Sequence, residues 1–245
     1  MFASDEALEK HLQEQAETSP LAKYLREIVY GGNDGIVTTF AVVAGFQGAQ
    51  IDPNTMAYMT VLLFGLANLF ADATSMGLGN FLSLRAEKDQ YHKERAKEIK
   101  RIETDVEVER AETAFMLKSH NFTAAEAEKI ALLISSNKEY WIDYMMRYEF
   151  NFADLSKENP LLKGIATFLS FIVFGIIPLT PFIFLKGSPN SFMYAVIATT
   201  AALLLLGLLR WRVTEQSIIR AVGESLLVGG LSAGIAYAVG TFFAI

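Results

Sequence analysis

The sequence predicts an all-α, polytopic membrane protein with five transmembrane helices and a helical cytosolic domain inserted between helices 2 and 3. Three observations predict this class. Apolar residues make up 52% of the 245 residues, and the mean hydropathy is +0.29. The apolar residues are clustered into long stretches without charge. A single charge-dense insertion, residues 85–160, interrupts these stretches.

Stretches without charge define the candidate spans. A helix needs about 20 residues to cross the ~30 Å hydrocarbon core of a bilayer. A second span is predicted from about Met56 to Leu84, and residues 28–50 form a weaker first span that contains Asp34. The remaining three spans are predicted at residues 164–185, 191–209 and 225–245.

The insertion differs in composition from the rest of the chain. Neither glycine nor proline occurs between Gly79 and Pro160, and charge is dense, which predicts long helices. We expect the second span to run straight into the first of them. A break is expected near Thr123, which can cap a helix together with Glu126 three residues later. A last helix is predicted over residues 138–152.

Two of the last three predicted spans contain residues that affect helix geometry or helix packing. Pro178 and Pro181 remove two backbone donors from the third span, so we expect that helix to be kinked or broken. The last span contains GGLSAGIAYAVG, residues 229–240, and this glycine content favours close packing of helices. Neither feature identifies a substrate.

Lysine and arginine counts predict the orientation, because cytosolic loops carry an excess of these residues. The insertion holds 13 of them, whereas the loop at residues 51–55 holds none. An odd number of spans puts the termini on opposite sides, so we expect a cytosolic N-terminus and a C-terminus outside. The predicted divisions are a cytosolic N-terminal segment, spans one and two, the inserted domain and spans three to five, at residues 1–26, 27–84, 85–160 and 161–245.

Composition excludes several classes of function. The chain contains no cysteine, which excludes disulfides, thiolate metal sites and cysteine nucleophiles. The net charge of −6 comes without a basic cluster, so no nucleic-acid partner is expected. The polar N-terminal segment lacks the pattern of a cleaved signal peptide. Neither an HExxH motif nor a serine-nucleophile motif is present, so we expect no enzyme and no cofactor.

Six acidic residues form a stripe in the first part of the insertion. At about 100° per residue, one continuous helix would place all of them within a sector of roughly 60°. Such a stripe is ordinarily a solvated face. The alternative is a divalent cation, which prefers carboxylate oxygens and would remove the repulsion. The six residues are Glu87, Glu94, Glu98, Asp105, Glu109 and Glu112.

The motif WIDYMMRYEF adds a different kind of donor. Met145, Met146 and Glu149 place two thioethers and a carboxylate within about one helical turn. Thioethers are soft ligands that suit Fe²⁺ and similar transition metals rather than Mg²⁺ or Ca²⁺. Methionines beside Trp141 and Phe150 are also ordinary core residues, so packing is the alternative interpretation.

Polar residues in the first two spans are candidates for a path through the membrane. A charge at bilayer depth costs at least ~2.5 kcal/mol and is a functional candidate by default. Asp34 lies within the turn-like run YGGNDG, residues 30–35, which indicates a helix cap, a local unwinding or a close approach of helices. On the second span, Asn68, Asp72 and Met76 recur every four residues, and a polar packing face is the alternative. Glu224 is expected to be a charge at the cytosolic rim.

Four motifs together resemble one family. YGGNDGIVTTFAVVAG, ADATSMGLGNFL, WIDYMMRYEF and GIIPLTPFIFL occur in the order and spacing of the vacuolar iron transporter family, and the resemblance covers residues 24–245. It implies a homodimer of five-span chains, each with a helical cytosolic metal-binding domain between spans two and three. It also implies Fe²⁺/H⁺ antiport that moves iron, and in some members Mn²⁺, out of the cytosol.

By position, the resemblance assigns site residues and shows two departures. Asp34 and Met76 match the family's transport path. Arg101 stands where the plant pattern has a glutamate, which leaves the number of bound metals open. Asn68 stands where that pattern has a second glutamate, and Asp72 is the candidate replacement, which leaves proton coupling open. The metal ligands of the domain correspond to Glu98, Glu109, Glu112, Met145, Met146 and Glu149, with Glu94 and Asp105 as weaker candidates.

The leading hypothesis is export of Fe²⁺, and secondarily Mn²⁺, by proton antiport, with Zn²⁺ as a further ligand of the domain. The rival is a membrane-anchored metal sensor or scaffold that does not transport. Expected partners are metal ions, protons, the lipid bilayer and a second copy of the chain. We expect the plasma membrane for a bacterial chain and the vacuolar membrane for a eukaryotic one; the short N-terminal segment and the first motif favour a bacterial chain.

Overall fold

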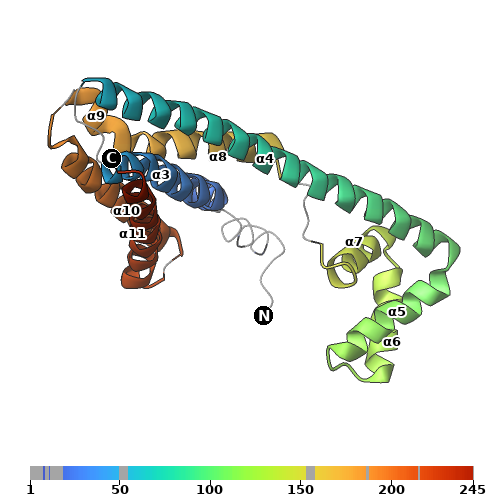
Figure 1. Cartoon of the computed structure of the whole chain (residues 1–245). Helices are drawn as coiled ribbons and strands as arrows, with labels where there is room; N and C mark the ends of the chain where they lie inside the picture. The colour runs from blue at the N-terminus through green and yellow to red at the C-terminus, as the bar shows by residue number, and fades with distance from the viewer. Residues whose placement is uncertain are drawn as a thin grey trace. The chain divides into compact units, whose positions relative to one another are not determined.

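All regular structure in the described part of the chain is helical. The structure is a computed structural model that describes residues 8, 11, 19–49, 55–152, 158–185, 188–214 and 216–244. The all-α prediction is confirmed for these residues, which contain no strand. The elements are α2 (Pro20–Lys23), α3 (Leu25–Gly48), α4 (Thr55–Thr104), α5 (Val106–Ser119), α6 (Ala124–Ser135), α7 (Lys138–Tyr148), α8 (Pro160–Gly175), the 3₁₀ turn η1 (Ile177–Leu179), α9 (Thr180–Phe184), α10 (Ser191–Thr214) and α11 (Ile218–Phe242) (Figure 1).

The chain divides into two compact units. The first comprises Met1–Phe81 together with Leu161–Ile245, and the second comprises Leu82–Pro160. Helix α4 contributes to both, as expected for a span that continues straight into the insertion. The predicted integral membrane class is confirmed, because several described helices are long and apolar enough to cross a bilayer. Four meet this criterion by length and composition, at Tyr58–Thr104, Pro160–Phe184, Ser191–Thr214 and Ile218–Phe242.

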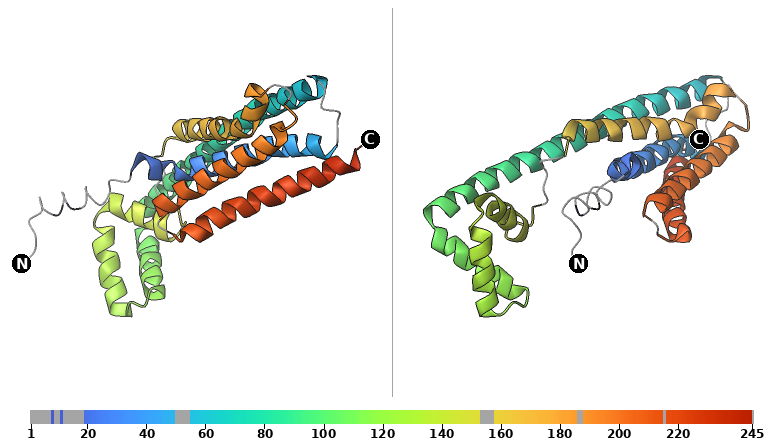
Figure 2. Two further views of the ribbon diagram at one scale, coloured as in Figure 1. Left: turned by 90° about the vertical axis from the view of Figure 1, so that its left-hand side faces the viewer. Right: turned by 180° about the vertical axis from the view of Figure 1, so that it is seen from behind.

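Helix α3, the predicted first span, passes without a break through the turn-like run around Asp34. The expectation of a cap or a local unwinding there is therefore wrong. The glycines instead serve close helix approach: a Cβ at Gly31 would lie 2.7 Å from the carbonyl oxygen of Thr167, and one at Gly35 would overlap that of Phe171. Helix α3 lies beside α10 and α11 (Figure 2). Packing against neighbours thus overrides the local turn preference of the sequence.

The predicted break in the third span is confirmed. Helix α8 ends at Gly175, and the chain continues through η1 into the short helix α9. Pro178 and Pro181 lie at the starts of these two elements, where a missing backbone donor is tolerated. The hydroxyl of Thr180 donates to the carbonyl oxygen of Ile177 at 2.7 Å, which satisfies one acceptor at the break.

Buried apolar side chains hold the helices of the first unit together. Ile36 of α3 and Leu206 of α10 are fully buried in one cluster. Leu69 of α4 and Phe171 of α8 are buried in another. Helix α3 therefore has a buried side along much of its length, and its neighbours include α8 and α10.

The second unit begins with the charged half of α4 and then turns sharply. The continuous helix that would align all six acidic residues does not form, because α4 ends at Thr104 and α5 begins at Val106. Between them, Asp105 has non-helical backbone angles of φ −130° and ψ 43°, and its carboxylate accepts a 2.8 Å hydrogen bond from the Thr104 hydroxyl. Short aspartate side chains commonly offer the backbone such a local alternative to helix.

Capping residues fix the other two helices of this unit. The predicted capping box is confirmed at α6, where the hydroxyl of Thr123 accepts from the backbone of Glu126 and the Glu126 carboxylate accepts from the backbone of Thr123. Asn137 caps α7. Helix α7 ends four residues earlier than the predicted residue 152, because Glu149 forms its C-cap and Asn151 turns the chain with φ 54°.

Candidate functional site

Three glutamates from three helices meet in the second unit. Glu98 lies near the end of α4, Glu109 in the first turn of α5, and Glu149 at the C-cap of α7. One carboxylate oxygen of each lies within 4.8 Å of the others. A continuous helix would separate Glu98 and Glu109 by about 16 Å along its axis. The turn at Asp105 is therefore what brings them together.

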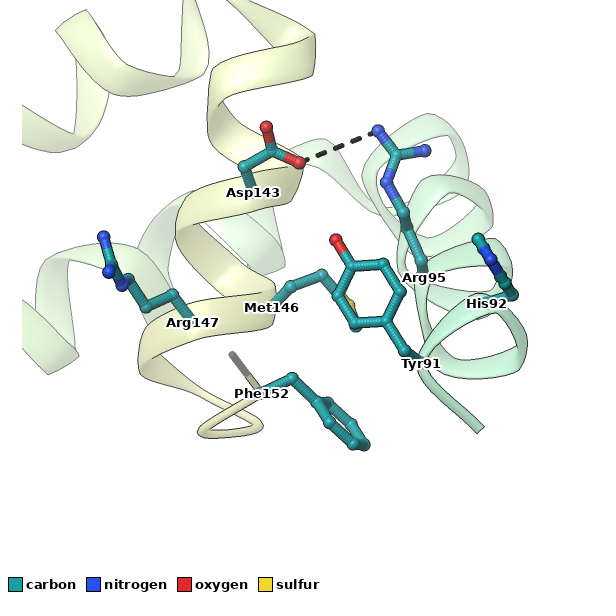
Figure 3. A pocket seen from close by; sticks show the side chains of 7 residues that line it. All are labelled: Tyr91, His92, Arg95, Asp143, Met146, Arg147 and Phe152. Atoms are coloured by element: carbon teal, nitrogen blue, oxygen red, sulfur yellow. Dashed lines mark ion pairs between the residues drawn. The ribbon is translucent and has the colours of Figure 1, made fainter. Parts of the chain in front are cut away.

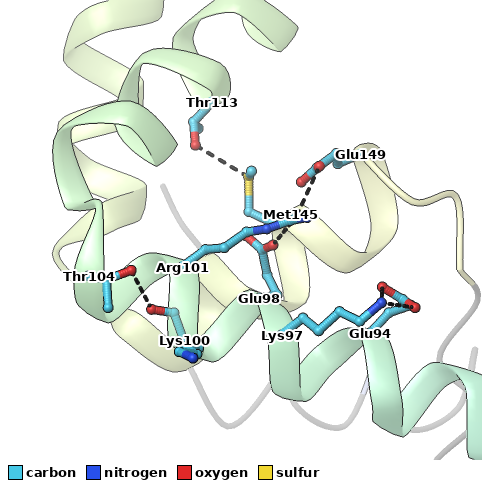
Figure 4. Close-up of polar contacts among 9 residues, drawn as sticks. All are labelled: Glu94, Lys97, Glu98, Lys100, Arg101, Thr104, Thr113, Met145 and Glu149. Carbon is cyan, nitrogen blue, oxygen red and sulfur yellow. Dashed lines mark hydrogen bonds and ion pairs between the residues drawn. The ribbon is translucent and has the colours of Figure 1, made fainter.

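This glutamate cluster is buried and only partly neutralised. Glu98 and Glu109 are 0% and 3% exposed. Glu98 Oε1 and Glu109 Oε2 have no hydrogen-bond partner among the described residues. The guanidinium of Arg101 lies 3.3 Å from Glu98 and 3.7 Å from Glu149 (Figure 4). A single arginine thus faces three carboxylates, which leaves oxygen lone pairs free for a cation.

Burial and mutual repulsion disfavour the charged form of these carboxylates. Desolvation, followed by the charges of Glu109 and Glu149, raises the pKa of Glu98 to about 7, against the opposing charge of Arg101. Desolvation also raises the pKa of Glu109, with the charge of Glu112 as the next cause. The pKa of Glu149 is raised mainly by desolvation as well. Such a cluster is stabilised by protons or by a bound cation.

Two buried thioethers lie in the same unit. Met145 and Met146 are 0% and 1% exposed and belong to its hydrophobic core, as the packing interpretation predicts. The Met145 sulfur lies 3.4 Å from the hydroxyl of Thr113, which also accepts a 2.8 Å hydrogen bond from the indole of Trp141. Figure 4 shows Met145 beside Glu98. The Thr113 hydroxyl also bonds the backbone carbonyl of Glu109 at 2.8 Å, so the sulfur lies against the helical turn that follows Glu109.

The other acidic residues of the stripe are placed differently. Glu112 is exposed, but its charge reaches the cluster, since it raises the pKa of Glu109. Glu94 forms a 2.8 Å ion pair with Lys97. Asp105 accepts from its neighbour Thr104 at the helix break. The structure thus does not bring the two weaker candidates, Glu94 and Asp105, into the glutamate cluster.

Two supporting residues were not found by sequence reasoning. Thr113 and Trp141 meet only because α5 and α7 pack together, and no spacing pattern in the sequence indicates that pair. Arg101 departs from the family pattern, and its contacts with Glu98 and Glu149 depend on the folded arrangement. Thr113, Trp141 and Arg101 thus support the site through contacts that exist only in the folded chain.

A separate cavity of about 590 Å³ lies between α4 and α7 and shares Met146 with the methionine pair (Figure 3). The guanidinium of Arg95 lies 3.7 Å from Asp143 and 2.6 Å from Glu139, both on α7. Its positive charge is thus neutralised by protein carboxylates. The arginine joins α4 to α7 and gives the cavity no evident ligand preference. The lining residues are Tyr91, His92, Arg95, Asp143, Met146, Arg147 and Phe152.

The candidate path residues lie in the first unit. Asp34 of α3 and Asp72 of α4 are both half-buried, and their carboxylates interact electrostatically. Met76 packs against the buried cluster that contains Phe171 of α8. Asn68 is exposed and lines an apolar groove of about 490 Å³. The charges of Asp34 and Asp72 thus act on each other, while Met76 packs in the cluster around Phe171 and Asn68 lines the groove.

Comparison with known proteins gives matches over nearly the whole chain. The sequence profile of the VIT family matches residues 25–241. Vacuolar iron transporter 2 of Oryza sativa subsp. japonica is 30% identical over 233 residues, which cover 95% of this chain and 90% of the relative. A vacuolar iron transporter of Plasmodium falciparum is 32% identical over 225 residues, covering 88% and 81%. One of Toxoplasma gondii is 31% identical over 240 residues, covering 94% and 77%.

Proposed function

The chain belongs to the VIT family, and from this premise we propose that it carries divalent transition metal ions out of the cytosol, with Fe²⁺ as first substrate and Mn²⁺ as second. The observation that carries the proposal is the glutamate cluster of Glu98, Glu109 and Glu149, whose oxygens lie within 4.8 Å of one another. The named relatives are iron transporters, which supports the cargo and confirms that the chain is not an enzyme.

The donor set of the second unit suits such a cargo. Carboxylate oxygens accept Fe²⁺ and Mn²⁺, and a thioether adds a preference for transition metals over Mg²⁺ or Ca²⁺. Glu98 and Glu109 each offer a buried oxygen that has no hydrogen-bond partner among the described residues. The Met145 sulfur contacts the hydroxyl of Thr113, one turn after Glu109. Because Arg101 already offsets part of the negative charge, we propose that this cluster holds one metal ion at a time.

We propose five membrane spans, with α3 as the first. Helix α3 has 24 residues, which corresponds to ~36 Å and is enough to cross the hydrocarbon core. Its packing against α8 and its position beside α10 and α11 support membrane insertion together with them. The 13 basic residues at 85–160 support a cytosolic second unit, which puts the C-terminus outside.

We propose that the metal passes Asp34 and Asp72. Two half-buried carboxylates on neighbouring apolar helices are costly when both are charged. A passing cation would neutralise them, and protons would do so once the cation has left, which is a physical basis for antiport. Met76, one turn beyond Asp72, offers a thioether along the same helix.

We also propose a homodimer. The groove of about 490 Å³ beside Asn68 is lined mainly by apolar residues of α3, α4 and α11, including Phe46, Phe64 and Val239. A second copy would remove this apolar surface from lipid and enclose the asparagine. An interhelical partner for a polar side chain within the membrane is a common source of helix association.

A flux assay tests transport directly. The chain is reconstituted into liposomes that contain a dye quenched by divalent metal, and Fe²⁺ is added outside with and without an imposed pH gradient. We expect Fe²⁺ entry faster than in protein-free liposomes and a further change in rate when the gradient is imposed. Entry no faster than in protein-free liposomes would leave only the rival function, a membrane-anchored sensor that binds metal without moving it.

A binding assay tests the second unit separately. Replacing Glu109 and Glu112 with alanine removes one carboxylate of the cluster and a second one that acts on it. We expect Fe²⁺ or Zn²⁺ affinity, measured by isothermal titration calorimetry, to fall by at least tenfold, as for loss of an important metal-site residue. The matched control, Glu107→Ala, removes an exposed carboxylate from the same turn of α5 and should leave affinity unchanged. If the Glu109→Ala, Glu112→Ala variant bound the metal as tightly as the control does, the acidic stripe would be a solvated face and not a metal site.

A further inference from the structure

A groove between α3, α10 and α11 combines apolar side chains with arginines. Its volume is about 640 Å³. The three helices lie side by side in the first unit (Figure 2). Its lining includes the apolar residues Leu25, Val29 and Val228 and the charged residues Arg26, Arg210 and Glu224.

The charges of this groove are unevenly matched. Glu224 lies 2.7 Å from the guanidinium of Arg210 and accepts a 3.1 Å hydrogen bond from Arg220. Arg26 forms no ion pair with any residue that the structure describes. Arg210 and Arg220 therefore share one carboxylate, and Arg26 has no carboxylate partner among the described residues. Because a guanidinium carries five N–H donors, several remain available for an anion.

The positions of these residues along their helices suit a ligand at the membrane interface that has a charged head and an apolar tail. Arg26 is the second residue of α3, Arg210 lies in the last two turns of α10, and Glu224 lies in the second turn of α11. Val228 follows Glu224 by one turn, toward the middle of α11. Charge thus lies at the helix ends, and apolar surface follows toward the membrane interior.

We propose that this groove binds an anionic phospholipid, with the phosphate between Arg26 and Arg210 and an acyl chain along Val29 and Val228. Basic pockets between transmembrane helices at the cytosolic side recognise anionic headgroups in this way. In the proposed orientation these helix ends face the cytosol, where anionic lipids are found. The inference rests on that orientation and on insertion of α3, but it requires no metal transport.

The neighbouring Trp211 provides a reporter. It follows Arg210 on α10 and is 39% exposed, whereas the only other tryptophan, Trp141, is 2% exposed in the second unit. The chain is reconstituted into phosphatidylcholine vesicles that contain a small fraction of brominated phosphatidylglycerol or, in parallel, brominated phosphatidylcholine. Bromine quenches tryptophan fluorescence at contact. We expect the brominated anionic lipid to quench at a several-fold lower mole fraction than the zwitterionic one.

Variants of single arginines distinguish lipid binding in this groove from general attraction of an anionic lipid to a basic surface. Arg26→Gln breaks no ion pair and should weaken the anionic preference several-fold, because it removes one of the two guanidinium groups proposed to contact the phosphate. Arg26→Lys keeps the charge and should largely keep the preference. Arg212→Gln removes an exposed arginine from the same end of α10, outside the groove, and should have no effect.

Three outcomes would overturn the proposal. The wild-type chain would show no preference between the lipids, or Arg26→Gln would behave as Arg212→Gln does. In the third, neither lipid quenches and Arg26→Gln changes the dimer fraction in light scattering, which would place a second copy in the groove. No metal is used in this assay, so its failure is distinct from a failure of the flux assay.

Discussion

At the scale of single residues, the chemistry of the second unit centres on Glu98. Its side chain is fully buried, two further carboxylates lie within 4.8 Å, and among the described residues Arg101 is the one cation that pairs with it. This arrangement is unfavourable for the empty, charged site and favourable once a cation is bound. Metal binding and proton binding therefore compete at the same oxygens.

The first prediction concerns the pH dependence of stability without metal. The folded chain raises the pKa of Glu98 to about 7, above the ordinary glutamate value of about 4.3. The folded state then binds more protons than the unfolded state between these pH values, so stability is full below about pH 4.3 and falls as pH rises to about 7. The raised pKa values of Glu109 and Glu149 act in the same direction.

Glu98→Gln should reduce this fall in stability, because the amide does not titrate. Thermal unfolding of the second unit can be followed by the fluorescence of Trp141, with a chelator present and Trp211 replaced by phenylalanine. Glu94→Gln is the matched control, since Glu94 lies one turn away on α4 and its pKa is lowered by Lys97. An equal loss of melting temperature between about pH 5 and about pH 8 in wild type and Glu98→Gln would contradict the assignment.

At the scale of elements, local residue patterns predict some helix boundaries correctly, whereas tertiary packing overrides them at others. The turn chemistry around Asp34 is inherent in the residues, yet α3 is continuous because Gly31 and Gly35 allow α8 to approach closely. The break at Asp105 could not be predicted, because the residues on both sides favour helix. The capping box of Thr123 and Glu126 was predictable, since it depends only on residues three apart.

The second prediction compares two glycines. A Cβ at Gly35 would overlap the backbone carbonyl of Phe171, so Gly35→Ala must separate α3 from α8. We expect a loss of about 1–3 kcal/mol, seen as a lower melting temperature in detergent. At Gly79 of α4 no atom lies within 4 Å of the added Cβ, so Gly79→Ala should be neutral or stabilising by about 0.5–1 kcal/mol. Similar melting temperatures for both variants would contradict the packing described for α3.

At the scale of the whole molecule, the apolar stretches without charge predict where the long apolar helices lie. Helices α8 to α11 overlap the predicted spans at 164–185, 191–209 and 225–245, because bilayer-length apolar runs are a local property of the sequence, although α11 begins at Ile218 rather than at residue 225. The glutamate cluster was predictable only in part. Glu98, Glu109 and Glu149 were identified as candidates, but their meeting depends on the turn at Asp105 and on how α7 packs, which the sequence pattern does not encode.

The third prediction tests the orientation of the chain. The protein has no cysteine, so single cysteines report accessibility without background. Glu128→Cys lies on the exposed side of α6, and Ala244→Cys lies exposed near the C-terminus. In intact bacterial cells expressing each variant, a membrane-impermeant maleimide should label Ala244→Cys and leave Glu128→Cys unlabelled until the cells are opened. The reverse labelling pattern would invert the proposed topology.

The central claim is that metal crosses the membrane past Asp34, and flux through a variant of this residue tests it most directly. Asp34→Asn keeps the size of the side chain and removes its charge, whereas the matched control Asp89→Asn makes the same change at an exposed position of the second unit. In liposomes with equal protein content, we expect Fe²⁺ entry through Asp34→Asn to fall at least tenfold and entry through Asp89→Asn to match wild type. Wild-type flux through Asp34→Asn would contradict the account.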